Sequence, residues 1–171
     1  GRDVGVSLVA GLLSAYIADI AGSQETVSLI EMGSPYFYEA FGIEKRFIHR
    51  EFLSFYDILN RRGNIKGLSN IEENINWILR CPPKPQSSNS VYDTSVQVRQ
   101  QKGISPDISL SHSFRVLHNV CGTILIFDCS GMPEDVLWDV LPEMDGIILV
   151  IDPMPSRLIP SGIMIQRLRL T

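Results

Sequence analysis

Apolar residues in the first third of the chain follow a helical pattern and then a strand-like one. Over positions 7–20 (SLVAGLLSAYIADI) large apolar residues return every three or four positions, which predicts a largely buried helix. Its expected core-facing stripe consists of Leu8, Leu12, Ala15, Tyr16 and Ile20, widened by Val9 and Leu13. Residues 26–32 (TVSLIEM) are apolar enough for a strand in a parallel sheet that is covered on both faces.

The middle of the chain predicts a loop with a short helix over 33–43 and two longer helices. The first spans 50–62, with helical spacing at Phe52, Phe55, Ile58 and Leu59. The second spans 69–79 and begins with a capping box, in which the Ser69 hydroxyl accepts a backbone donor and Glu72 reaches back. Its expected apolar face holds Ile71, Ile75, Ile78 and Leu79.

The last third alternates again after a segment rich in Pro, Ser and Gln. That segment, about 81–108, predicts a flexible or inserted stretch within a single domain of residues 1–171. Helices are expected over 111–120, 133–144 and 161–170, and buried strands over 122–131 and 145–153. Strands that alternate with helices indicate an α/β fold with a mainly parallel sheet flanked by helices. Such sheets bind ligands at the carboxyl ends of their strands.

Composition and charge exclude several classes of protein. The 171 residues carry a formal charge of −4, which argues against a general nucleic-acid binder. Three cysteines without regular spacing are typical of reduced thiols, and no apolar run reaches the roughly 18 residues of a membrane span. There is no basic leader with a cleavage site. These features predict a cytoplasmic protein.

Two segments carry candidate chemistry. Gly5, Val6 and Ser7 stand just before the first helix, where backbone N–H groups can surround an anion. A Gly-x-Ser sequence before a helix is common, and Ser7 as a simple N-cap is the alternative interpretation. The second segment is the apolar strand that ends in Asp128, with Gly131 three residues on. This is the form of a Walker B strand, whose Asp holds Mg²⁺ through water and whose Gly amide faces the terminal phosphate.

Together the segments resemble the MinD/ParA family of P-loop ATPases. The chain offers "GRDVGVS", "TVSLIEMG", "GTILIFDCSG" and "MDGIILVIDPMPSRL" in the family's order, over residues 1–33 and about 110–170. The resemblance implies a three-layer P-loop NTPase fold and a dimer. It also implies an ATP or ADP site with Mg²⁺, contacted by Gly5, Val6, Ser7, Glu31, Asp128 and Gly131, with Ser7 and Asp128 as the metal residues.

The departures from the family pattern are as informative as the matches. The family's two loop lysines fall at Gly1 and Val6, and its second acid falls at Gly33. A lost charge-assisted contact to phosphate removes on the order of 1.5–3 kcal/mol, and more in a transition state. The family also has a buried strand before the loop, so we expect a fragment or a sheet that is closed differently at that edge.

Other chemically active residues have simpler interpretations. His112 and His118 lie on different helix faces and make a poor metal pair. Cys129 is expected to be a buried small hydrophobe, and Ser130 lacks the frame of a hydrolase elbow. The acidic side chains of helix 133–144 should face solvent, and both tryptophans should pack. The basic tail suits a surface helix, with peripheral membrane association as the less favoured interpretation.

Three functions remain open from the sequence. The favoured one is a degenerate MinD/ParA-like domain that does not hydrolyse ATP and acts as a positioning, assembly or regulatory module through a protein partner or itself. The alternative is a functional Mg-ATP-binding ATPase whose lysine comes from Lys102 or from a partner chain. The third is an α/β binding domain that never had a nucleotide site.

Overall fold

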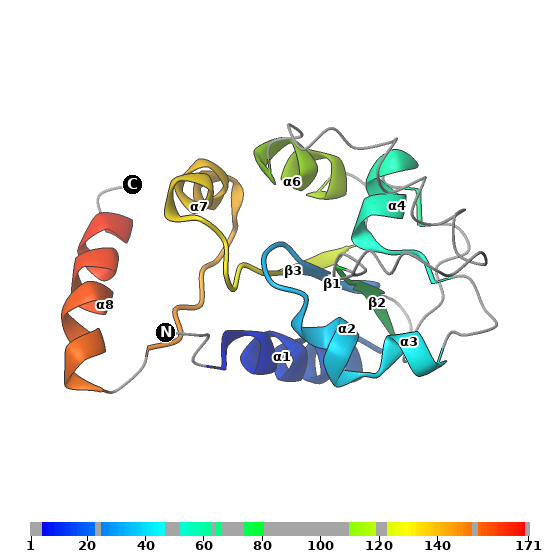
Figure 1. Ribbon diagram of the computed structural model, residues 1–171, viewed down its shortest axis with the longest axis horizontal. Coiled ribbons are helices and arrows are strands. Elements are labelled where there is room, and N and C mark those ends of the chain that lie inside the picture. The colour runs from blue at the N-terminus through cyan, green and yellow to red at the C-terminus, as the bar shows by residue number, and fades with distance from the viewer. Residues whose placement is uncertain are drawn as a thin grey trace, which may run out of the picture.

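Three parallel strands form the centre of the computed structural model (Figure 1). It describes residues 5–22, 25–46, 52–62, 64–65, 74–80, 110–118, 123–151 and 154–169. The strands are β1 (Val27–Glu31), β2 (Ile75–Ile78) and β3 (Ile124–Asp128), in the order β2-β1-β3. Both pairings are parallel. The predicted α/β fold with a parallel sheet is therefore confirmed.

Helices lie on both faces of this sheet. The helices are α1 (Val6–Ala21), α2 (Tyr36–Ala40), α3 (Ile43–Arg46), α4 (Phe55–Asn60), α6 (Leu110–His118), α7 (Glu134–Val140), the 3-10 turn η2 (Leu141–Glu143) and α8 (Pro155–Leu168). In Figure 1 α1, α2 and α3 lie below the strands, α4 and α6 lie above them, and α8 stands at the side.

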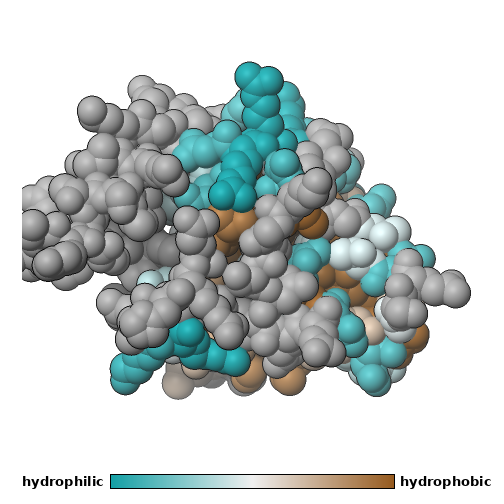
Figure 2. Space-filling view, turned by 90° about the vertical axis from the view of Figure 1, so that its right-hand side faces the viewer, coloured by the Kyte–Doolittle hydropathy of each residue, from teal (hydrophilic) through white to brown (hydrophobic). Residues whose placement is uncertain are grey.

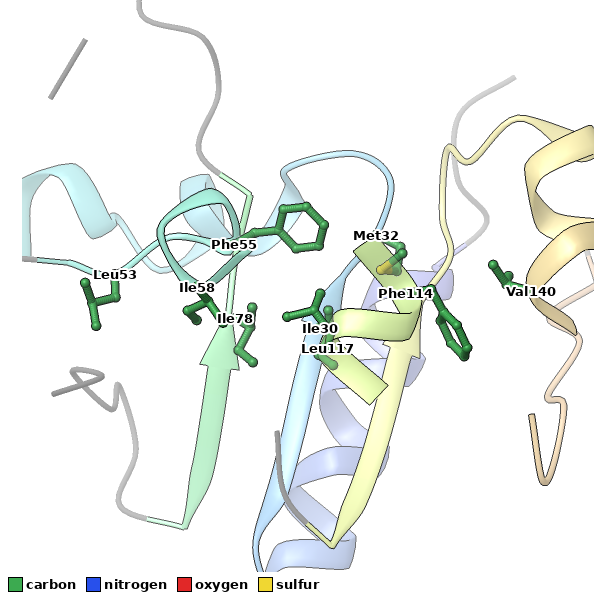
Figure 3. Packing of buried hydrophobic residues seen from close by; sticks show 9 residues of the cluster. All are labelled: Ile30, Met32, Leu53, Phe55, Ile58, Ile78, Phe114, Leu117 and Val140. Carbon is green, nitrogen blue, oxygen red and sulfur yellow. The ribbon is translucent and has the colours of Figure 1, made fainter. Parts of the chain in front are cut away.

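Alternation along β1 divides the core into two clusters. Leu29 points into a lower cluster with α1, α2 and α3, whereas Ile30 points into an upper cluster with α4 and α6. Figure 3 shows the upper cluster, where Phe114 and Leu117 of α6 lie over the sheet. Every residue of β1 is buried, because the strand has neighbours on both sides and helices on both faces.

The helix predicted over 69–79 is wrong where the structure describes it. Residues 75–78 form β2, which pairs in register with β1. Ile75 and Trp77 point into the lower cluster, and Ile78 points into the upper one. β-Branched and aromatic residues fit a pleated surface with two buried faces, and this pattern looks helical when only one face is considered. The Ser69–Glu72 capping box lies outside the described residues.

The first helix forms as predicted, but it buries a different face. Its buried residues are Ser7, Ala10, Ser14 and Ala18. Most large residues of the predicted stripe are exposed, with Leu12 at 63% and Tyr16 at 65%, and Leu13 is half-buried. Small side chains let the helix lie close to the sheet, and the Ser14 hydroxyl donates to the Ala10 carbonyl oxygen at 2.8 Å. The expected core-facing stripe is therefore wrong.

The strand predicted over 145–153 is also not formed in its described part. Residues 145–151 are irregular, and Ile148 is 64% exposed. A strand needs a hydrogen-bonding neighbour, and the described sheet has none beyond β3. The last helix begins at Pro155, six residues before the predicted start at 161, because proline fits the first helical turn.

Several other predictions agree with the structure. The strands over 26–32 and 122–131 contain β1 and β3, and the helix predicted over 111–120 overlaps α6, which begins one residue earlier at Leu110. Helix 50–62 is shorter than expected, because α4 begins only after Ser54, which forms a capping box with Asp57.

The segment at about 81–108 lies outside the described residues. No helix in the described ranges combines the length and hydropathy that crossing a bilayer requires.

Candidate functional site at the carboxyl edge of the sheet

The N-terminus of α1 lies beside the end of β3. Gly5 is the N-cap, with φ of 72°, and Val6 is the first helical residue. The Ser7 hydroxyl lies 3.0 Å from the Ser130 hydroxyl, and both side chains are buried. No side chain caps α1, so the simple N-cap interpretation of Ser7 does not hold. The contact joins the two segments, 123 residues apart, that carry the candidate chemistry.

Asp128 ends β3 as a buried carboxylate. Its Oδ1 accepts a hydrogen bond from the Ser130 backbone N–H at 2.9 Å. Its Oδ2 is buried and has no hydrogen-bond partner among the described residues. A buried carboxylate oxygen is normally satisfied by a donor, a water or a cation. Asp128 Oδ2 is therefore the carboxylate oxygen of this edge that no described donor satisfies.

The loops after β1 and β3 are bound to each other through their backbones. The Met32 N–H donates to the Asp128 carbonyl oxygen, and the Ser34 N–H donates to the Ser130 carbonyl oxygen, both at 2.9 Å. Gly33 passes so close that a Cβ atom there would lie 1.7 Å from the Ser130 oxygen. A side chain cannot be placed at Gly33 without moving this loop.

Gly131 completes the turn after β3. Its φ is 70°, a left-handed value that favours glycine. A Cβ atom at this position would lie 2.2 Å from the Ser34 hydroxyl oxygen. The turn therefore depends on glycine for both its backbone conformation and the space beside Ser34.

Glu31 lies next to Asp128 in the strand register but is engaged elsewhere. Its two carboxylate oxygens accept hydrogen bonds from the backbone N–H groups of Phe37 and Arg80. Burial raises the pKa of Glu31 to about 7, against the opposing effect of these two donors, and the charge of Asp128 adds to the rise. Glu31 thus connects the end of β1 to α2 and to the segment after β2 by hydrogen bonds.

Arg80 is a residue of this edge that the sequence interpretation missed. Its guanidinium donates to the carbonyl oxygens of Met32 and Gly33 at 2.8 and 2.9 Å, and to the Tyr56 hydroxyl at 2.6 Å. The group also lies 5.4 Å from the ring centre of Phe55. A strand assignment for "INWIL" would have placed Arg80 at a carboxyl end, where it can be recognised as a candidate.

The remaining candidates behave as structural residues. The Cys129 thiol is partly buried, and burial, followed by the charge of Asp128, raises its pKa to about 12. It is therefore protonated and a poor nucleophile. The acidic residues Glu134, Asp135 and Asp139 are exposed, as predicted. No group of three or more His, Cys, Asp or Glu side chains suited to a metal is present in the described part of the chain.

The chemical capacity of the edge follows from these contacts. It combines a helix N-terminus, two buried hydroxyls and one carboxylate oxygen without a partner. Among the described contacts of this edge, Arg80 provides a cation, and its guanidinium is directed at backbone carbonyls and Tyr56. Val6 places an apolar side chain at the start of α1. No lysine side chain takes part in the described contacts of this edge.

The structure brings most of the predicted site residues to one edge. Ser7 and Asp128 both contact Ser130, and Gly131 follows directly. Glu31 lies at the same edge but its carboxylate is turned to α2. No protein family, curated protein or solved structure matches the chain.

Proposed function

We propose that this chain is a degenerate P-loop-like domain of the MinD/ParA type that does not hydrolyse ATP and acts as an interaction module. The observation that carries the proposal is the 3.0 Å contact between the Ser7 and Ser130 hydroxyls. Under the family resemblance, this contact joins the loop hydroxyl to the turn that follows the Walker B-like strand. Their proximity is what a common ancestral pocket requires.

The residues at the edge fit a hydrated Mg²⁺ better than they fit a triphosphate. The Ser7 hydroxyl and the Asp128 carboxylate are oxygen ligands of the kind that Mg²⁺ prefers, and the unpartnered Asp128 Oδ2 supports this fit. Bound Mg²⁺ would neutralise phosphate charge. The backbone N–H groups of α1 would orient an anion, but Val6 provides no charge to hold it.

This balance argues against efficient hydrolysis. Transition-state charge in phosphoryl transfer needs cations placed beforehand. Gly33 removes the second acid and leaves no room for one. The edge therefore supports weak nucleotide binding or none. Function would then reside in surfaces that bind a protein partner or a second copy.

A substitution that restores the lysine tests this proposal. Val6→Lys should tighten Mg-ATP binding at least tenfold, since a charge-assisted contact contributes about 1.5–3 kcal/mol. Val9→Lys is the matched control, because it adds the same charge to an exposed position of α1. Calorimetry with Mg-ATP and Mg-ADP measures both variants against the wild type.

The outcomes separate the alternatives. We expect the wild-type chain to bind Mg-ATP more weakly than about 10 μM, or roughly 7 kcal/mol, and to hydrolyse it no faster than Ser7→Ala. Tighter binding with hydrolysis above that control would favour a working ATPase. Equal affinities for Val6→Lys and Val9→Lys would contradict the ancestral pocket and favour a binding domain without nucleotide history.

A further inference from the structure

The Arg80 side chain contacts both α4 and the loop after β1, just beyond the carboxyl end of β2. The Phe55 N–H donates to the Leu79 carbonyl oxygen at 2.8 Å, which places the start of α4 at this end of the strand (Figure 3). The centre of the guanidinium lies 5.4 Å from the ring centres of both Phe55 and Tyr56. These rings stand at 87° to each other, so the half-buried Arg80 lies against two aromatic surfaces.

The guanidinium keeps donors that the described residues do not use. A guanidinium has five N–H groups. Those of Arg80 donate to three described acceptors, which are the carbonyl oxygens of Met32 and Gly33 and the Tyr56 hydroxyl. At least two N–H groups therefore have no acceptor among the described residues. Tyr56 accepts the hydrogen bond from Arg80, so its own O–H is a further donor beside the guanidinium.

The charge of the guanidinium is not balanced within the described part of the chain. No described carboxylate forms an ion pair with it. The carboxylate of Glu31 accepts the Arg80 backbone N–H instead, and that of Asp57 accepts from Ser54 in the capping box. Carbonyl oxygens and a hydroxyl satisfy donors but carry no net charge. Because charges removed from water are normally paired, the contacts of Arg80 lack an anion.

These features favour a carboxylate as the missing partner. Guanidinium N–H groups match the two oxygens of a carboxylate or a phosphate in a planar contact. The site supplies one positive charge, and the buried carboxyl groups of Glu31 and Asp128 lie at the ends of the neighbouring strands β1 and β3. A phosphate dianion would exceed the charge of Arg80 and be repelled by these carboxylates, whereas a carboxylate monoanion matches the guanidinium.

We propose that the Arg80 guanidinium and the Tyr56 hydroxyl form a binding site for a carboxylate group. The site lies on the β2 side of the loop after β1, whereas Ser7 and Asp128 lie on the β3 side. The inference goes beyond the proposed function, because it requires neither a nucleotide nor Mg²⁺ at Ser7 and Asp128. The carboxylate belongs either to a small acid or to an acidic side chain of a protein partner.

NMR titration of the whole chain with sodium acetate tests the site, with sodium chloride as the matched salt at constant ionic strength. The Arg80 Nε–H resonance should shift along a saturable curve with acetate and not with chloride. Inorganic phosphate should bind at least threefold more weakly. The peptide Gly-Asp-Gly with blocked ends distinguishes the two sources: both results support the site, and tighter binding than acetate indicates a protein partner. No saturable shift with either carboxylate, or tighter binding of phosphate, would overturn the proposal.

Two substitutions distinguish a binding site from a purely structural arginine. Tyr56→Phe keeps the ring and removes the hydroxyl, so it should weaken acetate binding about three- to tenfold. Tyr36→Phe is the matched control, because it removes a hydroxyl from a 47% exposed residue of α2, and it should leave the affinity unchanged. Equal acetate affinities in the wild type and Tyr56→Phe would contradict the site.

Arg80→Lys keeps the charge and loses the planar group, so it should abolish saturable acetate binding. Unchanged acetate affinity in a folded Arg80→Lys chain would also overturn the proposal. Tyr56→Phe decides the question if Arg80→Lys does not fold, because the hydroxyl is the only group that it removes.

Discussion

The β2 side and the β3 side of the sheet have similar apolar sequences and opposite environments. On the β2 side, Trp77 packs edge-on against Phe37 and Phe41, with ring centres 5.3 and 4.7 Å apart. Figure 2 shows hydrophilic and hydrophobic residues side by side among the coloured residues of the face that it presents. On the β3 side, the run 147–151 is largely exposed. Apolar composition thus predicts that a segment can be buried, and the neighbours decide whether it is.

The largest difference in stability is expected between Ile→Ala substitutions on the two sides. Ile78 is fully buried in β2. Ile78→Ala should therefore lower the free energy of unfolding by about 2–5 kcal/mol. The same change at Ile148 should cost less than about 0.5 kcal/mol, because the side chain is already in solvent. Urea unfolding measures both variants. Equal losses would show that 147–151 is buried in solution and would remove the contrast between the sides.

The stability of the fold should depend on pH because of the buried carboxyl group of Glu31, the last residue of β1. The pKa of Glu31 is raised from 4.5 to about 7, so the folded state binds its proton more tightly than the unfolded state does. Its stabilising contribution is complete below pH 4.5 and is lost as the pH rises through 7. The full loss is on the order of 3 kcal/mol.

The measurement is urea unfolding at several values between pH 5 and pH 8. Glu31→Gln should flatten the dependence in this range, whereas Glu39→Gln, at an exposed position, should leave it unchanged. A dependence that persists in Glu31→Gln would assign it to another group.

Two glycines offer a third comparison: Gly33 in the loop after β1 and Gly146 just before the exposed run 147–151. Gly33→Ala would place a methyl group against the Ser130 carbonyl oxygen and should cost about 1–3 kcal/mol through forced backbone movement. Gly146→Ala, on the open side, has nothing within 4 Å of the new Cβ and should be neutral. Thermal unfolding compares the two variants. A neutral Gly33→Ala would mean that the two carboxyl-edge loops are not bound together in solution.

The smallest effect concerns the ion pair that holds α8 to α7. Glu134 accepts hydrogen bonds from Arg167 and from the Trp138 indole N–H. The paired side chains are 60% and 57% exposed, so Arg167→Gln should cost below about 1 kcal/mol. Unfolding in 50 mM and 500 mM salt should show the wild-type advantage shrinking. An unchanged advantage would indicate that Arg167 acts through packing on Trp138, whose ring centre lies 5.8 Å away.

The residues at the carboxyl edge show how much of the candidate site local sequence patterns can predict. Gly5, Ser7, Asp128 and Gly131 could be singled out because turn and strand-end residues have local signatures. The role of Glu31 as a backbone acceptor and the guanidinium of Arg80 could not be, since both depend on which strands become neighbours. No local pattern predicts the contact of Ser130 with Ser7, because it links segments 123 residues apart.

The sequence by itself determined the first helix, the strands β1 and β3 of a parallel sheet, and the strand ends where polar residues gather. These follow from local spacing and composition, which act within a few residues. Only the tertiary structure decided that 75–78 is a strand, that α1 turns its small residues to the sheet, and that 147–151 lies uncovered. Burial depends on contacts between distant segments, and no local pattern contains that information.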